Sequence, residues 1–211
     1  MQMMNQDIGR ILRASTTGFA VGCRVGQLSI AAFGGLVRAK PVDDREAIYG
    51  LIYNMSIDDD PLVRRLVLAE NPAPSVIEDQ RNNRLLPIEM SVLAVGYELD
   101  GVIKHGLPPR PPLNLDPVEL VAVASDVRGF TESLGYLRLI LRAVGSPVPV
   151  DQLLVAHIAS AYQLRGNDQA WALGVVHELI ELLRSNYDVL IPTLEALSDA
   201  IEIGDQRLEI G

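Results

Sequence analysis

One stretch near the middle of the chain constrains the fold more than any other, because a long strand pattern leads directly into a run of prolines. It spans Arg84–Val121 and reads RLLPIEMSVLAVGYELDGVIKHGLPPRPPLNLDPVELV. Leu86–Leu99 is long enough to cross a small barrel as one strand, and Asp100-Gly101 is a turn dipeptide. After that turn Val102–His105 can pair back as a short strand.

The proline run Leu107–Pro112 must be extended, because each proline fixes its own φ and pushes the preceding residue out of the helical region. Such a segment lacks most of its backbone donors, so we expect it to cross a surface as a strap. A strap of this kind also suits a boundary between two parts of a chain.

The residues before this stretch predict several short strands with close turns. The predicted strands are Ile8–Ala14, Phe19–Val25, Leu28–Phe33, Leu36–Val42 and Glu46–Ile57. Gly50 lies inside the last of them, which suggests a bulge or a tight bend at a barrel corner. Short strands separated by such close turns favour a small barrel over a parallel sheet.

An insertion at about residues 58–84 separates the early strands from the central one. Three aspartates and Pro61 indicate a helix start, and Leu62–Glu70 fits one or two helical turns. Ser75–Asn83 is predicted to be irregular or a second short helix.

The residues after the proline run are predominantly helical in pattern. Val118–Ala124 fits either a capped helix or a strand, and we favour a strand that closes the barrel. One helix is predicted from near Ser125 to Val144, and three more follow at about 150–165, 168–186 and up to Gly204. Four helices with short loops make a small bundle.

These patterns together predict an α+β fold, with an N-terminal small closed β-barrel followed by a C-terminal α-helical bundle. We expect the barrel to occupy residues 1–124, with its insertion, and an acidic bundle to occupy residues 125–211. A chain of 211 residues is a natural length for two small domains.

The charge of the chain is concentrated in its second half. Residues 1–112 carry 12 Lys+Arg against 13 Asp+Glu, whereas residues 113–211 carry 6 against 14, a net charge of −8. An acidic helical half repels a phosphate backbone, so direct nucleic-acid binding is not expected. Single-strand binding by the barrel is disfavoured by an aromatic content of 5%.

The N-terminus and the cysteine content favour a protein of the cytoplasm. MQMMNQDIGRIL has no basic region followed by an apolar one, as a signal peptide would. No apolar run approaches the roughly 18–20 residues that a membrane span needs. The single cysteine, Cys23, excludes an internal disulfide, which makes a reducing compartment the natural expectation.

Motifs of catalysis and cofactor binding are missing from the sequence. No G-x-x-x-x-G-K-[ST] loop occurs, and the only lysines are Lys40 and Lys104. His177-Glu178-x-x-Glu181 lacks the second histidine of a zinc protease helix, and a site made of His157, His177 and Glu181 is a remote alternative to buried helical histidines. We therefore expect no catalytic residues, no metal and no cofactor.

The order of these segments resembles the HAS-barrel, the domain shared by HerA-type DNA-translocating ATPases and ATP synthase subunits. The likeness covers roughly residues 8–124, and its sharpest pieces are Val95-Gly96-Tyr97 followed by Asp100-Gly101, the Leu107–Pro112 strap and the Val118–Val123 segment. The resemblance implies a small closed barrel used for ring assembly and partner docking. HerA-like ATPases work with NurA-like nucleases in DNA end processing, but no nucleotide-binding domain follows the barrel here.

Two functions remain open at this point. The first is a non-catalytic assembly or docking protein that binds itself or a HerA-type ATPase or NurA-type nuclease, through residues such as Tyr97, Asp100, Pro109, Arg110 and Pro111. The alternative is a small-ligand binder or unrecognised enzyme with its site between barrel and bundle, in a deep pocket lined by groups such as Arg110, Tyr97 and His105. A fixed ion pair of Arg110, flanked by prolines, is expected in either case.

Overall fold

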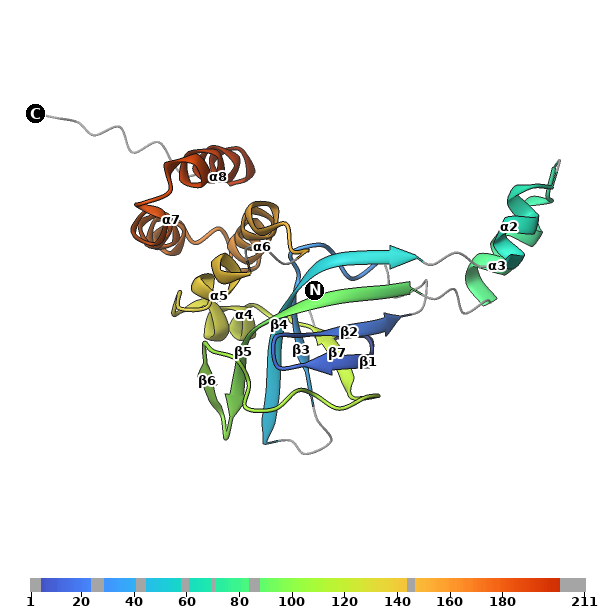
Figure 1. The fold of residues 1–211 in the computed structure, drawn as a ribbon, viewed down its shortest axis with the longest axis horizontal. Helices are drawn as coiled ribbons and strands as arrows, with labels where there is room; N and C mark the ends of the chain where they lie inside the picture. Colours follow the sequence, from blue (N-terminus) through green and yellow to red (C-terminus); the bar gives the residue numbers. More distant parts are fainter. Residues whose placement is uncertain are drawn as a thin grey trace, which may run out of the picture.

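The computed structural model describes residues 5–23, 29–40, 45–57, 61–69, 71–83, 88–143 and 147–201, and the fold below is that of these residues. Six antiparallel strands form a closed barrel (Figure 1). The strands are β1 (Gln6–Ser15), β2 (Gly18–Cys23), β3 (Leu36–Ala39), β4 (Glu46–Ile57), β5 (Ile88–Leu99) and β7 (Pro117–Leu120).

The barrel closes because each of these strands pairs with two others. Around the barrel the order is β1-β2-β5-β4-β3-β7, and β7 pairs again with β1. The short strand β6 (Val102–Lys104) pairs back onto the end of β5 through the turn at Asp100 and Gly101. The predicted α+β fold with a closed barrel is confirmed, and the ambiguous closing segment is a strand.

The interior of the barrel is filled by alternating apolar side chains from all six strands, as the period-2 pattern requires. A register shift between Tyr49 and Gly50 breaks the β4–β5 ladder at the glycine where a bulge was predicted. A Cβ at Gly50 would lie 2.3 Å from Cγ1 of Val92, so only glycine fits there. The barrel core consists of Ile8, Ile11, Phe19, Val21, Ala31, Val37, Ala39, Ile48, Ile52, Met90, Val92, Ala94 and Val118.

Two short helices lie between β4 and β5 and project beyond the ends of these strands (Figure 1). They are α2 (Pro61–Val67) and α3 (Pro74–Asn83), and we call the two together the helical arm. The arm interrupts a continuous hairpin, because Ile57 at the end of β4 is paired directly with Ile88 at the start of β5. Within the described residues, neither helix packs extensively on the rest of the protein.

Five helices follow the barrel among the described residues and lie to one side of it, with α7 and α8 farther from the strands than α4, α5 and α6 (Figure 1). They are α4 (Ala124–Thr131), α5 (Leu137–Arg142), α6 (Val150–Leu164), α7 (Gln169–Leu183) and α8 (Tyr187–Ala200). Helix α6 contacts each of the other four and also β4. No helix among the described residues is long and apolar enough to cross a membrane.

The apolar core of these helices continues into the barrel wall. Leu36, Tyr49, Leu51 and Val95 belong to strands, yet they share one cluster of buried side chains with helices α4–α8. The ring of Tyr49 stacks on that of Phe130 at a centroid distance of 4.6 Å. Barrel and helices are therefore held together by apolar burial as well as by chain connectivity.

The single helix predicted from near Ser125 to Val144 is wrong, because the chain forms two helices with a break after Thr131. The end of α4 is stabilised from another part of the chain: the indole Nε1 of Trp171 donates to the carbonyl of Thr131 at 2.9 Å. The guanidinium of Arg165 donates to the carbonyl of Arg128 and to the hydroxyl of Thr131. These bonds satisfy groups that a continuing helix would have used itself.

The strand predicted at Leu28–Phe33 is also wrong over its described residues, which form turns and irregular backbone. The reason lies in Gly34, whose backbone has a φ of +81° and whose N–H donates to the carbonyl of Ile52 at 2.8 Å. That geometry directs the segment towards helix α6 instead of extending it along the sheet. Leu28 itself lies outside the described residues, as does the Val144-Gly145 end of the predicted helix.

Candidate functional site

Two of the residues predicted to carry an interaction meet at one end of the barrel. Arg110 forms a bidentate pair with Glu46, through Nε at 3.0 Å and Nη2 at 2.5 Å, and Asp100 pairs with Arg45 at 3.3 Å. We call these four residues the barrel-end cluster. Because Arg45 and Glu46 are adjacent at the start of β4, one strand end fixes both pairs.

The proline strap holds Arg110 at this position. Pro108 and Pro112 are buried, whereas Pro109, Arg110 and Pro111 between them are exposed. The strap is anchored at its end by Asp116, which is 4% exposed and accepts a hydrogen bond from the backbone N–H of Leu113 at 2.8 Å. The predicted strap therefore presents its central three residues outward from a fixed backbone.

Tyr97 lies apart from this surface. Its ring packs against the barrel core and carries the ammonium of Lys104 at 5.9 Å from its centroid. The ion pair expected for Arg110 is formed within the chain, with Glu46.

Replacing Arg110 by alanine is expected to change the free energy of unfolding by less than about 1 kcal/mol, because the Arg110 side chain is 73% exposed and solvent screens the pair. The same guanidinium holds the pKa of Glu46 below its usual value, so this small contribution is lost as the pH falls through the titration of Glu46. Urea denaturation of both proteins at pH 7 checks the expectation. A loss above 2 kcal/mol would contradict it.

The histidines named as a remote metal site are not brought together. His157 is buried between the carbonyl of Gly34, at 3.2 Å from Nδ1, and the hydroxyl of Tyr136, at 3.1 Å from Nε2. His177 is exposed on α7. No group of three potential metal ligands occurs among the residues that the structure describes.

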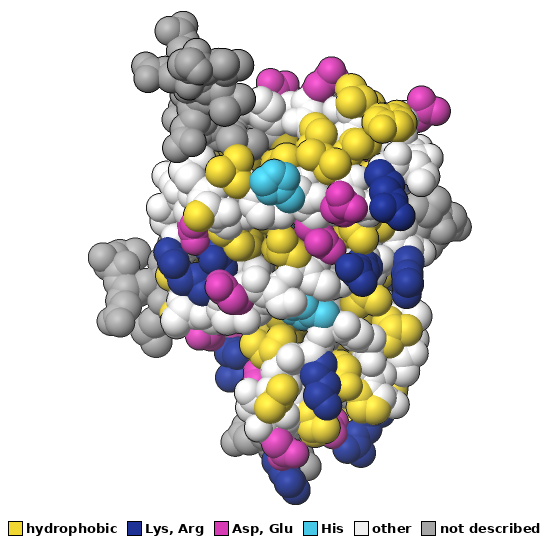
Figure 2. Space-filling view, turned by 90° about the vertical axis from the view of Figure 1, so that its left-hand side faces the viewer, with side chains coloured by type: hydrophobic (Ala, Val, Ile, Leu, Met, Phe, Trp, Pro, Cys, Tyr) yellow, Lys and Arg dark blue, Asp and Glu magenta, His cyan; other side chains and the backbone are white. Residues whose placement is uncertain are grey.

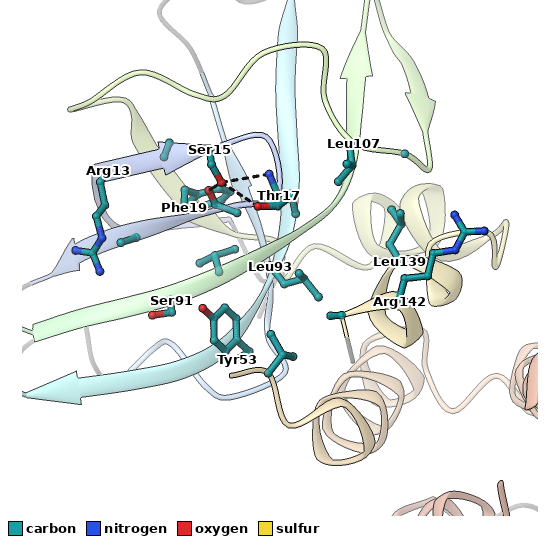
Figure 3. Close-up of a pocket in the computed structure, with 18 of the residues that line it drawn as sticks. Arg13, Ser15, Thr17, Phe19, Tyr53, Ser91, Leu93, Leu107, Leu139 and Arg142 are labelled. Carbon is teal, nitrogen blue, oxygen red and sulfur yellow. Dashed lines mark hydrogen bonds between the residues drawn. The ribbon is translucent and has the colours of Figure 1, made fainter. Parts of the chain in front are cut away.

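A groove lies where the barrel meets α5, and most of its residues were not predicted. We call it the junction groove; its cavity volume is about 890 Å³. Its walls are the β1–β2 hairpin, the middle of β5, Tyr53 of β4, the His105–Leu107 segment and the end of α5 (Figure 3). Of the three residues suggested for a pocket between barrel and helices, His105 lines this groove and Arg110 and Tyr97 do not.

Apolar side chains make up the middle of the junction groove. In Figure 3, Leu93, Leu107 and Leu139 lie between Arg142 on the helix side and Tyr53 with Ser91 on the strand side. Leu107 comes from the first residue of the proline strap, so the strap borders the groove as well as the barrel-end cluster.

The charged residues that line the groove are both arginines. Arg13 is paired with Glu89, whereas Arg142 is exposed and forms no ion pair with any residue that the structure describes. Burial lowers the pKa of His105, whose Nε2 lies 3.0 Å from the carbonyl of Phe130, so this histidine is neutral at pH 7. Among the described residues that line the groove there is no carboxylate, in a protein whose net charge is −9.

Sequence reasoning suggested a pocket between barrel and helices and named His105, but it missed most residues of this groove because its walls come from segments far apart in the chain. Arg13 and Arg142 are separated by more than half of the sequence, and neither stands in a motif. The sequence pattern of Tyr53, Ser91 and Leu93 indicates only that they belong to strands. A further signal was Leu107, at the start of the proline run.

Two other surfaces expose apolar side chains. On the helical arm, Val67 is 76%, Leu68 82% and Val76 43% exposed. Hydrophobic side chains also gather over α7 and α8, with charged ones among them (Figure 2); the large exposed ones are Leu173, Ile180, Tyr187 and Ile191. Single exposed apolar residues are ordinary, but several on a projecting element favour contact with another surface.

No protein-family model and no curated protein matches this chain. What the chain does is therefore inferred from the geometry of the barrel, the helical arm and the grooves.

Proposed function

We propose that this chain is a non-catalytic assembly and docking module that resembles the HAS-barrel of HerA-type ATPases. In this proposal it binds copies of itself or an ATPase or nuclease of the HerA–NurA type. The closed antiparallel barrel is the fold that the resemblance implies. In this proposal the helices that follow β7 are the acidic bundle of the predicted fold.

The observation that carries this proposal is the helical arm. Its helices have 7 and 10 residues, and isolated helices shorter than roughly 12–15 residues are marginal in water. Most of the described arm is exposed, including Val67 and Leu68, so little tertiary packing stabilises it. Burying these side chains against a partner would supply the missing stabilisation, at about 25 cal/mol per Å² of apolar area.

The arm is inserted into one hairpin of the barrel, so contact with a partner through the arm can be separated from the folding of the barrel. Ile57 and Ile88 are paired at its base, so the arm is an insertion into a hairpin that a two-residue turn could close. None of the described side chains of α2 or α3 belongs to either buried core cluster. An inserted element that the core does not need is suited to contact with a partner.

Replacing residues 58–87 by Asn-Gly is expected to leave a folded barrel with nearly unchanged thermal stability and to abolish assembly. The reason is that the described side chains of this stretch include exposed apolar ones and none that belongs to a core cluster. Size-exclusion chromatography with light scattering measures self-assembly, and a pull-down from native lysate read by mass spectrometry measures partner binding. A deletion variant that assembles and recovers the same ATPase or nuclease as the full chain would contradict the proposal.

A point substitution tests the same surface without shortening the chain. Leu68→Asp is expected to weaken assembly at least tenfold, because it places a charge on an apolar contact. Leu113→Asp is the matched control, since Leu113 is 70% exposed but follows the proline strap and lies outside the helical arm. Equal effects of the two substitutions would indicate non-specific association.

Nucleotide binding distinguishes this proposal from a catalytic one. The chain lacks the phosphate-binding loop of the ATPases that carry such barrels, so no heat of ATP–Mg²⁺ binding is expected in calorimetry. Tight ATP binding would overturn the non-catalytic function.

A further inference from the structure

We propose that the junction groove is a binding site for an organic anion with an apolar body, such as an aryl or acyl carboxylate or sulfonate. This site is separate from the assembly function, since no described residue of the helical arm lines the groove. Three observations carry the inference: the size of the groove, its unpartnered polar groups and the sign of its charge.

The groove has the size of a small-molecule site. Its volume of about 890 Å³ lies within the range of roughly 300–1,000 Å³ that is usual for ligand pockets. Leu93 and Leu139 are half-buried and Leu107 is 49% exposed, so their apolar surface is still available to a ligand. The apolar body of the ligand would lie on these three leucines (Figure 3).

Polar groups without partners stand on both sides of this apolar floor. The hydroxyls of Tyr53 and Ser91 form no side-chain hydrogen bond with the residues that the structure describes, in contrast to Ser15, which bonds to Thr17 and to the carbonyl of Gly18. Arg142 is the corresponding group on the helix side. Hydroxyls can accept or donate, whereas a guanidinium only donates and therefore selects an acceptor.

The charge of the groove selects an anion. Arg142 makes the groove locally positive on an acidic protein, because no carboxylate is among the described lining residues and Arg142 forms no ion pair with them. The bidentate geometry of a free guanidinium matches a carboxylate or sulfonate. Arg13, already paired with Glu89, adds little, so Arg142 is the residue that would bind the anionic group.

Arg142 has a matched control one helical turn earlier on α5. Arg138 is exposed as well, but it pairs with Glu178 at 3.3 Å and does not line the groove. Replacing either arginine by glutamine removes the same charge from the same helix. Only the loss at Arg142 should affect a ligand in the groove.

The test uses 8-anilinonaphthalene-1-sulfonate and its uncharged analogue N-phenyl-1-naphthylamine, which lacks the sulfonate, in fluorescence titrations of the full chain. We expect one site per chain that binds the sulfonate more tightly than the analogue. Arg142→Gln should weaken sulfonate binding about tenfold and leave the analogue unchanged, whereas Arg138→Gln should alter neither. Raising the salt concentration should weaken the sulfonate alone.

A second variant tests whether the apolar body of the ligand contacts Leu107. Leu107→Asp should weaken both probes, because it removes apolar contact and brings a charge to the groove; decanoate should displace the sulfonate from the unmodified chain. Equal affinity for the two probes, or sulfonate binding that Arg142→Gln leaves unchanged, would overturn the proposal. The variant without residues 58–87 should keep the site, so failure of the assembly proposal would leave this one standing.

Discussion

Gly34→Ala is expected to lower the free energy of unfolding by about 3 kcal/mol or more. Two independent costs add at this position. Its φ of +81° strains any residue with a Cβ, by about 1–3 kcal/mol. The new Cβ would also lie 2.7 Å from Cβ of Ala156 and 2.8 Å from the backbone nitrogen of His157, so helix α6 would have to move away from the barrel.

Urea denaturation followed by circular dichroism measures this loss. The control is Gly174→Ala in the middle of α7, where nothing lies within 4 Å of the added Cβ. That substitution should stabilise the protein by up to about 1 kcal/mol through helix propensity. If Gly34→Ala and Gly174→Ala had effects of the same sign, the close approach of α6 to the barrel would not be a determinant of stability.

The second large effect is a loss of stability on acidification that depends on His157. Burial lowers the pKa of this histidine to about 4 in the folded state, against roughly 6.5 in the unfolded chain. Between these values the unfolded state binds the proton and the folded state does not, so stability falls as the pH falls. From pH 7 to pH 4.5 we expect a loss of about 2–3 kcal/mol from this residue alone.

The hydrogen bonds of His157 explain why its neutral form belongs to the folded state. The carbonyl of Gly34 can only accept, so Nδ1 carries the proton and Nε2 accepts from the hydroxyl of Tyr136. The side chain of His157 on helix α6 therefore links Gly34, in the loop before β3, to Tyr136, the residue before α5. A second proton would add an unsolvated charge to this contact.

Unfolding free energies measured between pH 4.5 and pH 7 test the assignment. His157→Gln should be less stable at pH 7 but should lose most of the pH dependence, whereas the exposed His177→Gln should keep it. The pKa of His105 is also lowered in the folded state, so this residue too makes stability fall as the pH falls, and its contribution remains in both variants. A pH dependence that His157→Gln leaves intact would assign the effect to other groups.

Local chemistry explains what could be predicted. The strands β1, β2, β4 and β5, the bulge at Gly50, the β5–β6 turn and the extended strap follow from period-2 patterns, glycine and proline. Those signals act over a few residues, and a closed barrel is the arrangement that leaves no strand edge among six short strands. The barrel-end cluster could be predicted in part from the sequence, through Asp100 and the proline-flanked Arg110.

Other features depend on contacts between distant segments. The helical spacing of apolar residues from Val127 to Leu141 continues through the break after Thr131. That spacing carries no information about the hydrogen bonds from Trp171 and Arg165 that end α4. The junction groove is likewise the space left between six separate segments. Its residues become neighbours only when the helices pack on the barrel.

The sequence by itself determined the α+β class, the closed barrel, the inserted arm and the acidic helical half. These follow from residue properties that act locally or add along the chain. The tertiary structure decided where the helices end, which histidine is buried, and where a groove with unpartnered polar groups remains. The physical reason is that packing satisfies most polar groups with partners remote in sequence, and only the folded chain shows which groups it leaves available for a ligand or a partner.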